Sequence, residues 1–210
     1  MKIFELMKGN QSFQNVYFEN HEKEFLDLVN HGQEPKVLFI GCSDSRVIPS
    51  LIMGTKPGEL FVIRNIGNFV PPYSPDDDYH GTAAAIEYAV NILNVEDIIV
   101  CGHTHCGACE SLFKPRNKDL PHVNKWLELG NKAKEIALSK NISDNDEKLR
   151  LTEQISIVLQ VENLLTYPYI KERVKNKKIF IHGWYYIIEK GEIEYYNSKT
   201  QFFEPLASMS

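Results

Sequence analysis

Four short apolar segments restrict the fold of this chain more than any other feature of its sequence. Within each segment the apolar residues are continuous rather than alternating with polar ones, which is typical of strands buried on both faces of a parallel sheet. The segments are 36–42, 60–63, 97–101 and 178–183. We expect each of them to form a strand.

Helical patterns separate these strands. Between the second and third strands, residues 82–93 place Ala83, Ile86, Val90 and Leu93 at helical spacing, and residues 122–138 and 143–166 also suggest helices. Strands that alternate with helices predict an α/β fold, with a mostly parallel central sheet flanked by helices on both faces. The aromatic and β-branched segment 184–196, with a turn at Lys190-Gly191, predicts a C-terminal hairpin at the sheet edge.

The length of 210 residues predicts a single domain that spans residues 1–210. Residues 1–30 are polar and helical in character, with unevenly spaced apolar residues. We expect them to form an N-terminal arm of one or two amphipathic helices, which packs on something beyond the core of its own chain.

Charge and hydropathy exclude two classes of partner. The net charge is −5 and no basic stripe is visible, so nucleic acid is not an expected partner. The longest apolar runs are too short to span a bilayer, so no membrane partner is expected either. The N-terminal residues do not resemble a signal segment, which predicts a cytoplasmic location.

The chain has four cysteines, and in a reducing cytosol these favour metal binding or catalysis over disulfides. Cys106 and Cys109 form a C-x-x-C pattern, which is found in both redox and metal sites. We interpret Cys106 as a ligand and Cys109 as a small buried residue one helical turn later. Cys101 lies within an apolar strand, where we expect it to pack as a small hydrophobic residue.

Three potential metal ligands lie at the ends of predicted strands. Cys42 ends the first strand, and His103 and Cys106 closely follow the third. In α/β sheets, ligand sites gather beyond the carboxyl ends of the strands. Two thiolates and one imidazole suit Zn²⁺ and leave a fourth tetrahedral position for water. His105 competes with His103 as the nitrogen ligand, but the H-x-x-C spacing favours His103.

Asp44 and Arg46 flank the first ligand cysteine. A carboxylate near zinc can accept a hydrogen bond from the bound hydroxide, and a neighbouring guanidinium keeps that carboxylate ionised and in place. Because two thiolates neutralise much of the charge of the metal, we expect it to acidify its water only weakly. Activity should therefore rise toward alkaline pH.

These motifs resemble those of the β-class carbonic anhydrases, and the similarity extends over nearly the whole chain. The matching segments are Cys42-Ser43-Asp44-Ser45-Arg46-Val47, Lys56-Pro57-Gly58-Glu59, Arg64-Asn65, Gly81-Thr82, Ala85-Ile86-Glu87-Tyr88-Ala89-Val90, Gly102-His103-Thr104-His105-Cys106-Gly107, Leu164-Leu165-Thr166-Tyr167-Pro168 and Gly183-Trp184-Tyr185-Tyr186. The combination is highly specific.

The resemblance implies zinc-dependent, reversible hydration of CO2 to bicarbonate and a proton, by attack of zinc-bound hydroxide on CO2. It implies that Cys42, His103 and Cys106 hold the zinc and that Asp44 and Arg46 form the catalytic dyad of the family. In some members this aspartate moves onto the zinc when its arginine partner is lost. Asp44 is therefore a conditional fourth ligand, present only in a closed form.

The resemblance also suggests which residues contact the substrate. Gln33, Phe61 and Tyr88 match the residues that line the CO2 pocket of plant-like members, and the backbone N–H of Gly107 is a candidate donor to a bound anion. Another branch of the family binds bicarbonate at a regulatory site with a tryptophan, an arginine and a tyrosine. Arg64 is present here, but Phe39 stands in place of that tryptophan, which favours the constitutively open type.

Family members are dimers or higher multiples, with pockets between subunits and N-terminal arms that cross the partner. We therefore expect this chain to associate as a dimer or tetramer, and residues 1–30 suit the role of such an arm.

Three alternatives remain open at this stage. Some relatives with this fold hydrolyse carbonyl sulfide or carbon disulfide. A non-catalytic zinc or redox module would use Cys106 and Cys109, and a bicarbonate-sensing protein would keep the zinc without rapid turnover. The proton-transfer group is also open: His80, His105 and His122 are candidates because histidine titrates near neutrality.

Overall fold

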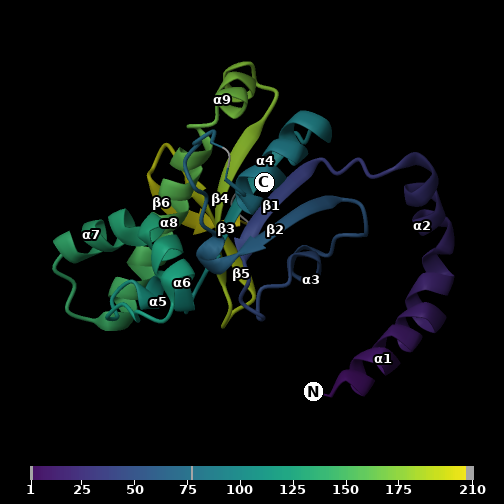
Figure 1. Cartoon of the computed structure of the whole chain (residues 1–210), viewed down its shortest axis with the longest axis horizontal. Helices are drawn as coiled ribbons and strands as arrows, with labels where there is room; N and C mark the ends of the chain where they lie inside the picture. The colour runs from purple at the N-terminus through teal and green to yellow at the C-terminus, as the bar shows by residue number, and fades with distance from the viewer. Residues whose placement is uncertain (1, 77, 207–210) are drawn as a thin grey trace.

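The computed structural model describes residues 2–76 and 78–206, and it is built around one six-stranded sheet (Figure 1). The strand order is β2-β1-β3-β4-β5-β6. Strands β1 to β4 run parallel, and β5 and β6 join antiparallel at one edge. The bounds are β1 Val37–Cys42, β2 Leu60–Asn65, β3 Asp97–His103, β4 Phe180–Ile187, β5 Glu192–Asn197 and β6 Phe202–Pro205.

The predicted α/β architecture and its four apolar strands are confirmed, with two differences at the C-terminal edge. The fourth strand continues to Ile187 and is itself the first strand of the expected hairpin, which turns at Gly191 with a positive φ of 70°. Strand β6 is not predicted by the sequence pattern. It pairs with β5 and extends the antiparallel C-terminal edge of the sheet by one strand.

One face of the sheet carries the main core. There, side chains such as Leu38, Ile40, Ile98 and Val100 pack against the helices that connect the strands. The helices that contribute to this cluster are α4 (Gly81–Glu87), which continues as a π-helical turn (Tyr88–Ile92), α8 (Asn145–Leu164) and α9 (Pro168–Lys175).

The opposite face has less helical cover than the sequence pattern predicts. Phe39, Ile99 and Cys101 form a small buried cluster there, and the helical residue that packs on it is Met53 of the five-residue helix α3 (Pro49–Met53). Val62 of β2 is 40% exposed. A helix of little more than one turn cannot cover a sheet of this width, so part of this face remains open in the single chain.

A group of short helices lies beyond the carboxyl ends of β1 and β3. The predicted helix 122–138 is interrupted: α6 (Pro121–Leu127) and α7 (Asn131–Ser139) are separated by a 3₁₀ turn that ends at Gly130. A Cβ atom at Gly130 would lie 2.9 Å from side-chain carbons of Leu112 and Phe69. The break thus brings the backbone close against the apolar cluster that contains Cys42 and Cys106.

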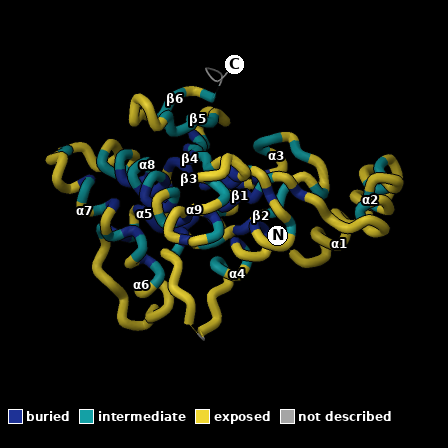
Figure 2. The backbone as a smooth tube through the Cα atoms, turned by 90° about the horizontal axis from the view of Figure 1, so that it is seen from above, coloured by how far each residue is buried: buried dark blue, intermediate teal, exposed yellow. Residues whose placement is uncertain are grey.

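The N-terminal arm is present as expected and extends away from the sheet (Figure 1). It consists of α1 (Ile3–Ser12), a π-helical turn (Phe13–Phe18) and α2 (Glu19–His31), and none of the residues from 3 to 31 is buried (Figure 2). Lys56 contacts Glu24 at 3.2 Å, which links the base of the arm to the domain. None of the helices in the described chain combines the length and apolar character that a membrane span requires.

Candidate metal centre

The structure brings together the three predicted ligands. Cys42 is the last residue of β1, His103 is the last residue of β3, and Cys106 directly precedes α5 (Gly107–Ser111). Because β1 and β3 are adjacent and parallel, their carboxyl ends meet at the same edge of the sheet. All three side chains are buried, and one donor atom from each lies within 4.8 Å of the other two.

His103 presents one ring nitrogen to the centre of this group. Its Nδ1 lies 2.8 Å from the backbone oxygen of Thr104, a contact that places the ring proton on Nδ1. Its Nε2 is buried and has no hydrogen-bond partner among the described residues. A buried nitrogen lone pair without a partner is costly unless it ligates, so the residues fit a bound metal ion.

The two thiols need a cation to ionise. Hydrogen bonding with Cys106 and burial raise the pKa of Cys42 to about 12, and contact with Cys109 and burial also raise the pKa of Cys106. In the metal-free chain both are therefore thiols at neutral pH. The borderline-soft donor set of two sulfurs and one nitrogen is the kind that Zn²⁺ prefers.

The other two cysteines pack as the sequence pattern predicts. Cys101 is buried in the small cluster on the opposite face of the sheet. Cys109 is buried one helical turn after Cys106, in the apolar cluster that includes Leu112 and Leu127. All four cysteines are free thiols.

Asp44 and Arg46 lie beside the ligands and are paired with each other. Arg46 Nε donates to Oδ1 of Asp44 at 2.9 Å, and Nη2 donates to Oδ2 at 2.7 Å. These bonds hold the pKa of Asp44 well below its usual range, so the carboxylate is ionised. With both oxygens occupied, Asp44 stays with the arginine rather than joining the three ligands.

Arg64 of β2 donates hydrogen bonds to the backbone of the same loop. Its Nε donates to the backbone oxygen of Cys42 at 3.0 Å, and its Nη2 donates to that of Asp44 at 2.6 Å. The sequence pattern gives Arg64 as part of a matching segment and associates it with the regulatory site of another family branch. In the structure it fixes the backbone on both sides of Ser43.

Glu153 is a site residue that the sequence pattern does not reveal. This carboxyl group is 2% exposed on α8, and it accepts hydrogen bonds from the backbone N–H of Cys106 at 2.8 Å and from the Tyr185 hydroxyl at 2.6 Å. Burial raises its pKa to about 7. One signal was available: Glu153 lies four residues from both Leu149 and Ile157, on the apolar stripe of the helix.

Comparison with known proteins identifies the family. A family model described as carbonic anhydrase matches residues 37–193. The chain is 40% identical over 208 residues to a carbonic anhydrase of Helicobacter pylori (strain J99 / ATCC 700824), covering 96% of this chain and 94% of that protein. The solved structure of the β-carbonic anhydrase CcaA matches with a TM-score of 0.91 and 39% identity, over 97% of this chain and 98% of that chain. This chain belongs to the β-class carbonic anhydrases.

Two further relatives extend the comparison. A carbonic anhydrase of Synechocystis sp. (strain ATCC 27184 / PCC 6803 / Kazusa) is 41% identical over 202 residues, which cover 94% of this chain and 72% of that protein. A tetrameric β-carbonic anhydrase from the filamentous ascomycete Sordaria macrospora matches with a TM-score of 0.82 and 29% identity, over 92% of this chain and 95% of that chain.

In this β-carbonic anhydrase, the expected pocket residues are not gathered around the ligands of their own chain. Gln33 is exposed in the connection between α2 and β1. Phe61 stacks on Tyr88 with ring centroids 5.9 Å apart, and Tyr88 is 42% exposed. Phe61 is level with Leu38 in the sheet, four residues or about 13 Å along the strand direction from Cys42. Gly107, in contrast, directly follows Cys106.

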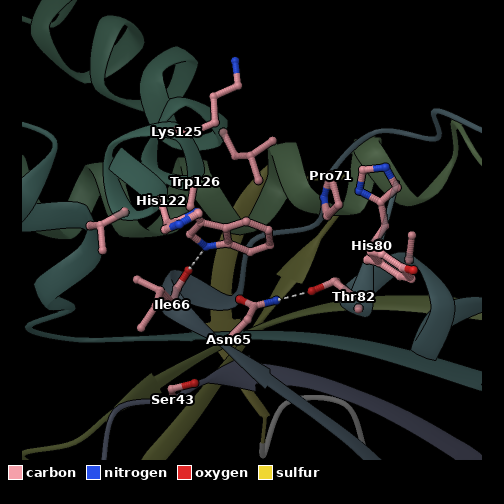
Figure 3. Close-up of a pocket in the computed structure, with 14 residues that line it drawn as sticks. Ser43, Asn65, Ile66, Pro71, His80, Thr82, His122, Lys125 and Trp126 are labelled. Carbon is pink, nitrogen blue, oxygen red and sulfur yellow. Dashed lines mark hydrogen bonds between the residues drawn. The ribbon is translucent and has the colours of Figure 1, made fainter. Parts of the chain in front are cut away.

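A largely apolar cavity of about 730 Å³ opens beside Ser43 and Asn65 (Figure 3). The indole N–H of Trp126 donates to the backbone oxygen of Ile66 at 2.7 Å, which fixes the ring in the cavity wall. His80 and His122, two of the three candidate proton-transfer groups, line this cavity. His105 lies elsewhere, in the loop between the ligands.

Proposed function

We propose that this chain catalyses the zinc-dependent, reversible hydration of carbon dioxide to bicarbonate and a proton. The observation that carries the proposal is the buried group of Cys42, His103 and Cys106, in which His103 Nε2 has no hydrogen-bond partner in the described part of the chain. Asp44 is paired with Arg46 beside this group. The names of the relatives support the same reaction.

Cys42, His103 and Cys106 would hold the zinc. When bound, zinc supplies a Lewis acid that lowers the pKa of a water molecule. Asp44 is ionised and has lone pairs to accept a hydrogen bond from a neighbouring water or hydroxide, and Arg46 fixes the direction of those lone pairs. The backbone N–H of Gly107 is our candidate donor to the bicarbonate product. Because the dyad keeps Asp44 away from the ligands, we assign the chain to the open type.

The remaining pocket residues would come from a second copy of the chain. The partly buried Phe61 and the exposed Tyr88 form an aromatic pair that is remote from Cys42 of the same chain. With Gln33, they would supply an apolar wall with a single amide, which suits a small, linear and uncharged substrate.

The N-terminal arm supports this assembly. Many of its apolar side chains are exposed in the single chain, and they include Phe4 at 69% exposed and Met7 at 60%. Such a surface is stable in water when another subunit covers it, so we propose a dimer or tetramer in which the arm packs on a partner copy. Phe4→Glu with Met7→Glu should lower the mass measured by light scattering, whereas unchanged mass would oppose this role of the arm.

We place the protein in the cytoplasm. Its four cysteines are unpaired thiols, as is usual in a reducing compartment. Fractionation of the source cells tests this assignment.

Stopped-flow CO2 hydration by the zinc-loaded protein, scanned across pH, tests the proposed reaction. Fast turnover that rises toward alkaline pH is expected. Negligible turnover at every pH with one zinc per chain would reject the proposal, and so would turnover of carbonyl sulfide in place of CO2.

A further inference from the structure

His105 has a backbone conformation that residues with side chains seldom adopt. It lies between the ligands His103 and Cys106, and its φ is 57°, in the left-handed region. Such a conformation is uncommon for residues other than glycine, so the contacts around His105 help to hold it. The side chain and the backbone of His105 contact different parts of the protein.

The side chain of His105 is held by Glu189, which follows β4. Glu189 Oε1 lies 2.7 Å from His105 Nε2, and Oε2 accepts a hydrogen bond from the Thr104 hydroxyl at 2.6 Å. Arg150 of α8 contacts Oε1 at 2.9 Å. The hydroxyl of Thr104 also accepts the backbone N–H of Ile188 at 3.1 Å, which ties this loop to the end of β4.

The backbone of His105 contacts the dyad of Asp44 and Arg46. Its carbonyl oxygen accepts a hydrogen bond at 3.0 Å from Arg46 Nη2, the same nitrogen that donates to Asp44. A continuous chain of contacts therefore joins Glu189 to Asp44 through the peptide of His105 and the guanidinium of Arg46.

We propose that Glu189 is a positioning residue for the dyad: it holds His105 in the conformation that presents the His105 carbonyl to Arg46. This inference rests on the proposed function, since it assigns Glu189 a part in the reaction of the same site. Glu189 touches none of the ligands' donor atoms in the contacts of the described chain, so it acts through its neighbours.

An ordinary surface ion pair does not account for these contacts. Three side chains converge on one carboxylate, and two of them belong to consecutive residues of the ligand loop. Hydrogen bonding from Thr104 lowers the pKa of Glu189 to about 2, so the acceptor is charged throughout the neutral range. An exposed pair alone would contribute little.

Glu189→Ala is the first test, and Glu192→Ala is the matched control. Glu192 is also an acidic residue of the hairpin, and it pairs only with Lys190 among the described ion pairs. We expect Glu189→Ala to lower kcat about tenfold with little change in KM, and Glu192→Ala to change neither. Equal effects of the two variants, or no effect of Glu189→Ala, would overturn the proposal.

A second readout does not depend on turnover. Hydrogen exchange of the Arg46 Nε proton, followed by NMR of arginine-labelled, zinc-loaded protein, reports how firmly the guanidinium is held. We expect exchange to be at least tenfold faster in Glu189→Ala and unchanged in Glu192→Ala. Unchanged exchange in Glu189→Ala overturns the positioning role, whereas a wild-type protein without CO2 hydration rejects only the proposed function.

His105→Asn tests the same link without altering Glu189, in case Glu189→Ala does not fold. Asparagine tolerates the left-handed conformation but cannot reach as far as the imidazole. We expect the same faster exchange at Arg46, and no further effect when the two substitutions are combined, because both break one chain of contacts. Independent, additive effects would overturn the proposal.

Discussion

The guanidinium of Arg46 holds both carboxylate oxygens of Asp44, at 2.9 Å from Nε to Oδ1 and 2.7 Å from Nη2 to Oδ2. The backbone N–H of Arg46 adds a third bond to Oδ1 at 3.0 Å. Two parallel bonds fix the plane of a carboxylate as well as its charge. We propose that this pairing keeps Asp44 from joining the three candidate ligands.

Loss of Arg46 should therefore inactivate the site without removing its metal. In Arg46→Ala the carboxylate of Asp44 is free to move toward the three ligands. We expect one zinc per chain by metal analysis and a fall in kcat of at least tenfold by stopped flow. Arg46→Lys should restore little, because an ammonium group cannot form the two parallel bonds. Full activity in Arg46→Ala would contradict the role of the dyad.

Metal binding should release protons. The pKa of Cys42 is about 12 and that of Cys106 is also raised, so both ligands are protonated in the metal-free chain at pH 7. Zinc must displace about two protons, and its affinity should rise about 100-fold per pH unit near neutrality. Calorimetry in two buffers with different ionisation enthalpies measures the number released. A binding heat that does not depend on the buffer would contradict this prediction.

The two cysteines of the C-x-x-C pattern should behave differently. Cys106 is one of the three grouped donors, whereas Cys109 is buried in an apolar cluster. We expect Cys106→Ser to lose stoichiometric zinc and activity. Cys109→Ser should keep both, with a stability cost of about 1–3 kcal/mol for the buried hydroxyl. A redox module would show the reverse for Cys109, since its loss would then abolish function.

Glu153 should make the stability of the metal-free chain depend on pH. Its pKa is 4.5 in an unfolded chain and about 7 in the folded one, so its contribution is fully present below pH 4.5 and is lost as pH rises through 7. Glu153→Gln keeps an acceptor for the Cys106 N–H and has no charge to bury. Between pH 5 and pH 8, the variant should gain up to about 3 kcal/mol relative to wild type. Urea unfolding at both pH values measures this difference.

Mixed oligomers test whether two chains share a pocket. Cys42→Ser removes a ligand, and Phe61→Ala removes part of the pocket wall that we assign to the partner copy. When the two variants are co-expressed, half of the dimers are mixed and one of their two sites is intact, so about a quarter of wild-type activity should return. Each variant alone is the control. If the mixture is no more active than the average of the two variants, Phe61 does not line a partner's site.

The strands and the ligands were predictable from the sequence because both depend on local pattern. Continuous apolar runs identified β1 and β3, and the parallel arrangement that such runs favour places Cys42 and His103 at one sheet edge. The break in 122–138 was not predictable, because helical spacing continues across Gly130. At the break, Gly130 lets the backbone approach Leu112 and Phe69, which are distant in the sequence.

By itself, the sequence determined which residue types stand at the carboxyl ends of the strands, and hence a set of two sulfurs and one nitrogen of the kind that Zn²⁺ prefers. Only the tertiary structure decided which hydrogen-bond partners those groups have. It left Nε2 of His103 without a hydrogen-bond partner among the described residues and paired both oxygens of Asp44 with Arg46. It also brought Glu153 and Glu189 to the loop of residues 103–106 from 47 and 84 residues away. The physical reason is that a sequence pattern determines local structure, such as one strand or one or two turns of a helix. The hydrogen bonds to a buried loop come instead from whichever elements the tertiary packing places beside it.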